Sequence, residues 1–286
     1  RVRSVAVSNG FTALIAGTGS LGVHDGPGPL ATFNEPYAVV VSAADVSYVT
    51  CLGSQTIRKV DASAVVTTLA GAGPVGSNDG AGAVATFNDP YGLHLVGSDA
   101  FMYITDRGNN RIRLVETATG LVTTHLSVTG CYAVALDPNS ATVFVVANDV
   151  HEVYSYGAVL PTPGPAPVLP ALSWTAGQSG ETGDRAGTAG YARFNTPYGL
   201  AVNADKDLVV GGGLNNRVYK VSPVGRVNQW VGSGTAGRAD GLTIKAEVAF
   251  VTNVAIDGAG NTFVTCQNDN IIVGITPGGT LGHLVG

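Results

Sequence analysis

The chain has 286 residues, 45% hydrophobic and only 12% charged, with a formal net charge of −5. This length is enough for a large core in one or two domains. The chain is acidic, and its Lys and Arg form no cluster larger than short pairs. It therefore lacks the basic surface that neutralises nucleic-acid phosphates. No apolar run approaches the roughly 20 residues of a membrane helix. We therefore expect no nucleic-acid binding and no membrane-spanning segment.

The first 17 residues contain two short strand-like runs, Arg1–Val7 and Phe11–Gly17. They match the last two strands of the repeat that follows, so we expect them to form half of a blade. The chain opens without an initiator Met, and no signal-peptide core is visible. We interpret it as a segment of a longer protein, and the sequence leaves open whether the strands that complete this blade follow Gly286.

A repeated motif dominates the rest of the chain. Ala-Thr-Phe-Asn-x-Pro-Tyr occurs at 31–37 and 85–91, and Ala-Arg-Phe-Asn-Thr-Pro-Tyr at 192–198. The prolines are 90 − 36 = 54 and 197 − 90 = 107 residues apart, one period and about two. Degenerate copies lie at 130–133 and 246–253. Self-similarity at this period is typical of repeat architectures.

Each period reads as four short strands. In the second repeat they cover 92–96, 101–105, 111–115 and 121–126, each bounded by Gly, Asn, Asp or Ser. Such a sheet buries both faces only when sheets pack radially, so we predict an all-β β-propeller of four-stranded antiparallel blades. We expect one domain with six blade positions, one of them incomplete. The expected boundaries are 1–17 for the incomplete blade and about 18–70, 71–126, 127–176, 177–231 and 232–286 for the repeats.

Long Gly-rich loops join the last strand of most repeats to the first strand of the next. They carry Asp-Gly at 25–26, 79–80 and 240–241, with Asp184 as a variant. One Asp per loop is too few for a calcium site, so we interpret these residues as turn formers. The third repeat lacks this insert and carries a proline-rich stretch at 161–170. That stretch is a spacer or, alternatively, a ligand for a proline-binding domain.

The segment Asp106-Arg-Gly-Asn-Asn-Arg-Ile-Arg113 strongly resembles the NHL repeat, and Leu214–Val218 repeats part of it. The resemblance covers nearly the whole chain. It implies a propeller, but its relatives range from RNA-binding proteins and sensor domains to interaction scaffolds, and similar propellers occur in lyases and hydrolases. Within the motif, Asp106 is expected to brace the turn after the second strand. The function must therefore be argued from the site.

The candidate binding residues stand on the first strand of each repeat, the one expected to lie innermost. Its first position is Tyr37, Tyr91, Tyr132 or Tyr198, so rotational repetition would gather these rings near one channel mouth. Packing between blades is the alternative role for the four rings. His94 stands where other repeats have Val or Ala, and is either a functional group or a structural histidine.

We expect a non-catalytic binding or interaction module for a protein or small ligand, because the inner strands are almost wholly apolar. The alternative is a lyase or hydrolase with a metal in the central channel. No catalytic motif, metal site or cofactor site is predicted, and the widely spaced Cys51, Cys131 and Cys266 do not favour zinc or a disulfide. The small number of Lys and Glu slightly favours an extracellular or cell-surface location, although no glycosylation sequon occurs and the compartment stays open.

Overall fold

A computed structural model describes residues 1–137, 140–157 and 173–285. These residues form two compact units. The first contains residues 1–6 and 11–134, and the second contains residues 7–10, 135–157 and 173–285. The boundary between them falls within strand β12. The proline-rich stretch predicted at 161–170 lies outside the described residues.

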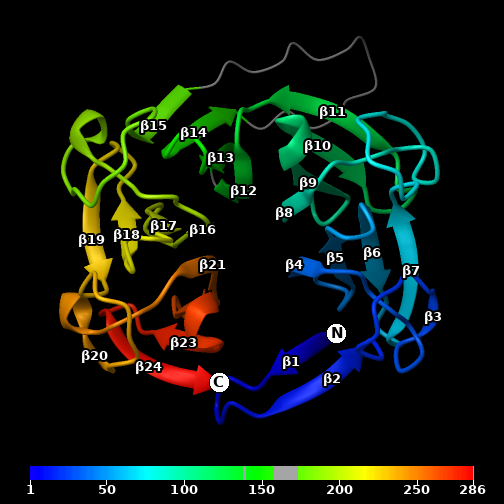
Figure 1. Ribbon diagram of the computed structural model, residues 1–286, viewed down its shortest axis with the longest axis horizontal. Coiled ribbons are helices and arrows are strands. Elements are labelled where there is room, and N and C mark those ends of the chain that lie inside the picture. Colours follow the sequence, from blue (N-terminus) through cyan, green and yellow to red (C-terminus); the bar gives the residue numbers. More distant parts are fainter. Residues whose placement is uncertain (138–139, 158–172, 286) are drawn as a thin grey trace. The chain divides into compact units, whose positions relative to one another are not determined.

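The first unit contains a two-stranded sheet and two complete blades (Figure 1). The two-stranded sheet consists of β1 (Val2–Val5) and β2 (Thr12–Ala16). Blade 1 consists of β4 (Pro36–Val41), β5 (Ser47–Cys51), β6 (Thr56–Val60) and β7 (Val65–Ala70), with the short β3 (Gly26–Pro27) paired to β7. Blade 2 consists of β8 (Pro90–Val96), β9 (Phe101–Asp106), β10 (Arg111–Glu116) and β11 (Val122–Ser127), with the 3-10 turn η1 (Arg107–Asn109) between β9 and β10.

Blade 3 begins at the unit boundary, and blades 4 and 5 follow in the second unit. Blade 3 consists of β12 (Cys131–Asp137), β13 (Thr142–Ala147), β14 (Glu152–Gly157) and β15 (Ser173–Gly177). Blade 4 consists of β16 (Leu200–Val202), β17 (Leu208–Gly211), β18 (Val218–Val221) and β19 (Val227–Val231), preceded by η2 (Ala189–Tyr191). Blade 5 consists of β21 (Val251–Ile256), β22 (Thr262–Cys266), β23 (Ile271–Ile275) and β24 (Thr280–Val285), with β20 (Gly241–Leu242) paired to β24 and the turns η3 (Thr243–Lys245) and η4 (Gln267–Asp269).

These sheets are the blades of a β-propeller, as the sequence predicts: the described residues form five blades of antiparallel strands and a two-stranded sheet consistent with an incomplete sixth. The second and third strands of a blade are covered on both faces, which explains their apolar runs. All five residues of β5 are buried, whereas three of the six residues of the outer strand β7 are exposed. Each buried Val or Ile side chain contributes roughly 1.5–3 kcal/mol relative to exposure.

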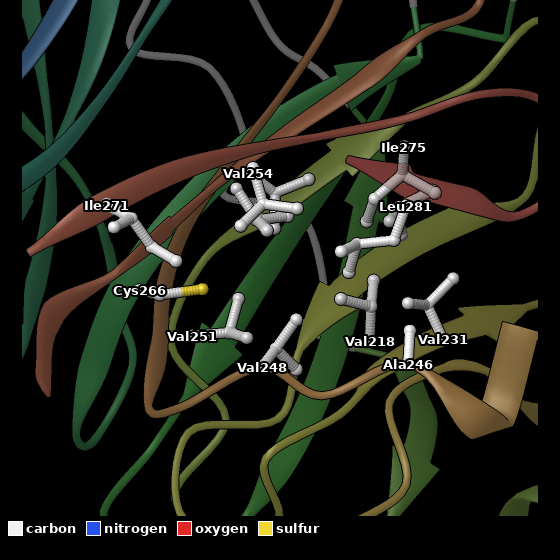
Figure 2. Close-up of a cluster of buried hydrophobic side chains, with 13 residues drawn as sticks. Val218, Val231, Ala246, Val248, Val251, Val254, Cys266, Ile271, Ile275 and Leu281 are labelled. Atoms are coloured by element: carbon white, nitrogen blue, oxygen red, sulfur yellow. The ribbon is translucent and has the colours of Figure 1, made fainter. Parts of the chain in front are cut away.

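Faces of neighbouring blades pack through small and branched apolar side chains. In the first unit, Ala38 and Ile57 of blade 1 belong to the same buried cluster as Met102 and Ile104 of blade 2. In the second unit, Figure 2 shows Val218 and Val231 of blade 4 together with side chains of blade 5 and of the loop that leads into it. The two-stranded sheet joins a further cluster through Val2 and Ala16.

The long loops place a glycine against the outer strand of the blade they enter. Gly26 pairs with Val66, and Gly80, Gly187 and Gly241 make the equivalent pairings in blades 2, 4 and 5. Gly26 and Gly80 have φ of 132° and 136°, a region that disfavours side chains. The loops therefore have a second role besides the expected turns: they add a short fifth strand to blades 1 and 5 and an isolated bridge to blades 2 and 4. All helical elements among the described residues are three-residue turns, and none is long and apolar enough to cross a membrane.

Candidate functional site

Three of the four predicted tyrosines lie together in the first unit. Tyr37 on β4, Tyr91 on β8 and Tyr132 on β12 each occupy the second residue of the first strand of their blade. The ring of Tyr91 lies 4.6 Å from that of Tyr37 and 4.5 Å from that of Tyr132, measured between centroids. The hydroxyls of Tyr37 and Tyr132 form a short hydrogen bond with each other. We call these three residues the tyrosine cluster.

The rings of the tyrosine cluster differ in exposure. The exposed fraction is 37% for Tyr37 and 7% for Tyr132, and Tyr91 is half-buried. The guanidinium of Arg107, from η1, lies 5.5 Å from the Tyr91 ring centroid and 5.9 Å from that of Tyr132. A cation over aromatic faces at such distances is stabilising. The cluster therefore combines phenol edges, ring faces and a positive charge.

A turn and a hydroxyl fix the start of each inner strand in the first unit. Glu35 and Asp89 precede the Pro-Tyr pairs with φ of 51° and 55°, so the chain turns sharply just before each tyrosine. The Oγ1 of Thr50 accepts a hydrogen bond from the N–H of Ala38 at 3.1 Å and donates one to the carbonyl of Tyr91 in the next blade at 2.7 Å.

Thr105 repeats this arrangement between Gly92 and the carbonyl of Tyr132, at 2.7 and 2.8 Å. A Cβ on Gly92 would lie only 2.8 Å from that carbonyl, so glycine is required there. Sequence reasoning missed Thr50, Thr105 and Arg107. The two threonines share the penultimate position of the second strand, which is a signal that could have found them.

Tyr198 lies in the second unit, just before β16. It is half-buried, its ring centroid is 5.2 Å from that of Phe250, and its N–H donates to the carbonyl of Gly211. The geometry of the tyrosine cluster is therefore described for three of the four predicted rings.

His94 lies on β8, with Tyr103 opposite it in the sheet. Burial lowers the pKa of His94 to about 4, because the apolar surroundings disfavour the imidazolium. The imidazole is therefore neutral near pH 7. Among the described residues, no group of three or more His, Cys, Asp or Glu side chains could hold a metal ion.

The three cysteines are free thiols and buried. Burial raises the pKa of Cys51 and Cys266 to about 11 and that of Cys131 to about 12. A thiol is a poor nucleophile when its pKa is raised in this way.

The Asp of each Asp-Gly loop binds the outer strands of the blade that the loop enters. In blade 2, Asp79 accepts hydrogen bonds from Arg113 at 2.7 Å and from the N–H of Thr124 at 2.9 Å. Burial by itself would raise the pKa of Asp79, but these hydrogen bonds hold it below its usual value. Asp25 makes the same contacts with Arg58 and Thr68 in blade 1.

The same contact recurs with different partners in the second unit. Asp184 accepts hydrogen bonds from Arg217, Tyr219 and Gln229 in blade 4. In blade 5, Asp240 lies 3.1 Å from His283. We call this contact between a loop carboxylate and the outer strands the loop latch.

Asp106 contacts the turn after β9 through the side chain of Asn109, and it also joins the blade 2 latch. Its carboxylate accepts hydrogen bonds from the N–H of Asn88 at 2.7 Å and from the side chain of Asn109 at 2.8 Å. It also pairs with Arg113 at 2.7 Å, and neither side chain is exposed to solvent. Arg113 therefore lies between two carboxylates.

Comparison with known proteins supports the fold. No family model matches the chain. It is 23% identical over 283 residues to the protein SUPPRESSOR OF QUENCHING 1, chloroplastic, of Arabidopsis thaliana, a match that covers 90% of this chain and 26% of that protein. The chain thus spans about a quarter of the length of this relative.

Solved structures with the same architecture come from proteins of different kinds. An auxiliary nutrient binding protein from Bacteroides ovatus superposes with a TM-score of 0.61 at 15% identity, covering 95% of this chain and 76% of that one. A chain of a nidogen/laminin complex gives 0.59 at 13% identity, covering 84% and 75%. A virginiamycin B lyase from Staphylococcus aureus gives 0.55 at 11%, covering 87% and 69%. At these identities the likeness concerns the fold alone.

Proposed function

We propose that this chain is a non-catalytic binding module of the NHL type, and that the tyrosine cluster with Arg107 is its contact surface for a protein or small ligand. The observation that carries the proposal is the contiguous set of three rings and one guanidinium. Tyr and Arg are the residue types most enriched among energetically dominant contact residues. Two proteins of similar fold, an auxiliary nutrient binding protein and a chain of a nidogen/laminin complex, are consistent with binding as a use of this architecture.

The fixed backbone beneath the tyrosine cluster supports the proposal. The backbone carbonyls of Tyr91 and Tyr132 are held by Thr50 and Thr105, whose hydroxyls connect the second strand of one blade to the first strand of the next. A surface that is already ordered loses little conformational entropy when a partner binds. Tyr37 precedes Ala38, whose N–H donates to Thr50, and it has the largest exposed fraction in the cluster, so it is the expected anchor.

The alternative function, a lyase or hydrolase, has less support from the site. The cluster consists of phenols that bond to each other, and the one predicted titratable residue on an inner strand, His94, is a weak base with a pKa of about 4. General acid–base catalysis works best with a pKa near the working pH. The likeness to a lyase is a likeness of fold, which hosts many functions.

The test is a selection from a random peptide library displayed on phage, with the wild-type chain as bait. Affinities of the selected peptides are then measured for the wild type, Tyr37→Ala and Tyr191→Ala. Tyr191 is 66% exposed and is no part of the cluster, so it is the matched control. We expect Tyr37→Ala to weaken most selected peptides by about fivefold to thirtyfold, the scale of a hot-spot residue, with Tyr191→Ala neutral. Peptides that are indifferent to Tyr37→Ala would count against the proposal.

A further inference from the structure

Blade 3 lacks the loop latch. The chain runs from the end of β11 at Ser127 to the start of β12 at Cys131, whereas the loop into blade 2 runs from Ala70 to Pro90. The latching Asp79 stands nine residues beyond Ala70 (79 − 70 = 9). The loop into blade 3 is too short to place a carboxylate at the equivalent position.

The side chains of the third strand change along with the loop. In the sheet register, Glu152 of β14 lies opposite Ala147, just as Arg111 lies opposite Asp106 in blade 2. Tyr154 therefore stands where Arg113 stands in blade 2. Blade 3 thus has a carboxylate on the strand where blade 2 has two guanidiniums, and it has neither of the aspartates that bind Arg113.

An open cavity of about 570 Å³ lies at this place. It is lined by Glu152, Tyr154, Gly190 and the three residues at the end of β15 and beyond, Gly177, Gln178 and Ser179. We call it the blade 3 cavity. All of its lining residues belong to the second unit. A cavity of this size could hold a side chain or a small organic molecule.

Glu152 is buried, with an exposed fraction of 6%, yet it lines the cavity. Its carboxylate accepts a short hydrogen bond from the hydroxyl of Tyr154. Burial raises the pKa of that phenol to about 12, and so do the hydrogen bond and the charge of Glu152. In the described part of the chain, no Lys, Arg or His nitrogen forms an ion pair with Glu152. Buried carboxylates are normally compensated by a cation.

The nearest histidine does not supply that cation. His151 precedes Glu152, and its Nδ1 accepts a hydrogen bond from the N–H of Thr196, which requires the unprotonated form of that nitrogen. Burial also lowers the pKa of His151. The negative charge of Glu152 therefore faces the cavity without a neutralising partner from its neighbour.

We propose that the blade 3 cavity binds a guanidinium group from outside the chain, with Glu152 as its carboxylate and Tyr154 holding that carboxylate in place. Blade 2 supplies the precedent within the same fold. There the guanidinium of Arg113 binds two carboxylates and the carbonyls of Thr86 and Asn78. A planar guanidinium pairs well with a carboxylate, and such charged hydrogen bonds are stronger than neutral ones. The group belongs either to an arginine side chain of a partner or to a free small guanidine.

The experiment titrates the intact chain with two probes, agmatine and the blocked peptide acetyl-Gly-Gly-Arg-Gly-Gly-amide. Binding is followed by the backbone amide NMR shifts of Gly177, Gln178 and Ser179. Both probes carry the guanidinium, so binding of either one supports the site. Binding of the peptide alone identifies a protein partner, and binding of agmatine alone identifies a small guanidine.

Glu152→Gln is expected to weaken binding at least about tenfold, which corresponds to about 1.4 kcal/mol. The matched control is Glu181→Gln, which removes the same charge from an exposed residue outside the cavity lining and should leave affinity unchanged. On the ligand side, citrulline in place of arginine keeps the shape and removes the charge, and should abolish the shifts.

A second variant covers the case in which Glu152→Gln disturbs folding. Ser179→Arg places a guanidinium at the exposed edge of the cavity, where it should occupy the site and weaken binding of both probes. The proposal is overturned if neither probe saturates these amides, if citrulline binds equally well, or if Glu181→Gln weakens binding as much as Glu152→Gln. It is equally overturned if Ser179→Arg leaves the affinity unchanged. The tyrosine cluster is not involved in any of these outcomes.

Discussion

Blades 2 and 3 have the same order of strands, but they differ in the buried charges near the loops that enter them. Blade 2 buries Arg113 between Asp79 and Asp106, so each of these carboxylates has a guanidinium partner. Blade 3 buries Glu152 beside a phenol and faces a cavity. The loop into blade 2 supplies one of the matching carboxylates, and the loop into blade 3 is too short to do so. Whether the buried charges of a blade are paired therefore depends on the loop that enters the blade as much as on its strands. In blade 3 the short loop supplies no partner, and a cavity lies at this position.

The largest effect is expected from breaking the blade 2 set. Arg113→Met should lower the free energy of unfolding by about 3–5 kcal/mol, because it leaves Asp106 buried without its cation. Urea denaturation measures the change. The control is Arg111→Met, since Arg111 is partly exposed and makes one 3.3 Å contact with the carbonyl of Ser77. If both variants lost the same stability, the importance assigned to the ion pairs of Arg113 in blade 2 would be wrong.

A smaller, pH-dependent effect distinguishes the inner strands of the two blades. His94 of blade 2 corresponds to Ala135 of blade 3 in the repeat. The folded pKa of about 4 lies below the usual 6.5, so the unfolded chain binds the proton more readily. His94 therefore lowers stability as pH falls from about 6.5 to about 4 and has no such effect above that window, with a cost of about 1–3 kcal/mol at the acid end.

The measurement for this prediction is the difference in unfolding free energy between wild type and His94→Ala across pH 4–7. Using the difference removes the contributions of His125 and His151, whose pKa values burial also lowers. The acid-dependent part of the stability should be smaller in the variant. Parallel pH profiles for the two chains would contradict the assignment to His94.

The smallest effect is expected in blade 3 itself. Glu152→Gln should change the free energy of unfolding by less than about 0.5 kcal/mol or raise it slightly, because the variant removes a buried charge that has no cation and keeps an acceptor for Tyr154. Thermal and urea unfolding at pH 7 check this. If Glu152→Gln lost as much unfolding free energy as Arg113→Met, Glu152 would have a structural partner. Blade 3 would then have a paired buried charge, as blade 2 does.

The fold could be predicted from the sequence to a large extent, because the evidence for it is local and repeated. Strand lengths, the period of the Pro-Tyr motif and the two extra strands at the start follow from alternation and turn residues. Tyr37, Tyr91 and Tyr132 could be expected to lie together because they share one position in the repeat. Rotation from one blade to the next places equivalent residues side by side. Arg107 was missed, because its motif implied a role in the turn and said nothing of the rings that lie beneath its guanidinium.

The sequence by itself determined the blades, their order and the tyrosines near the start of the inner strands of blades 1 to 3, because these depend on short-range patterns that the repeats share. Only the tertiary structure decided which charges meet. The sequence predicts only turns at the Asp-Gly pairs. The carboxylate of Asp79 contacts Arg113, 34 residues away in the chain, only when the loop has folded against the blade. The short loop before β12 was visible in the sequence, but the burial of the Glu152 carboxylate and the cavity that it lines were not. Burial and the absence of a neighbouring cation depend on all the elements that pack around a residue, and no single repeat encodes them.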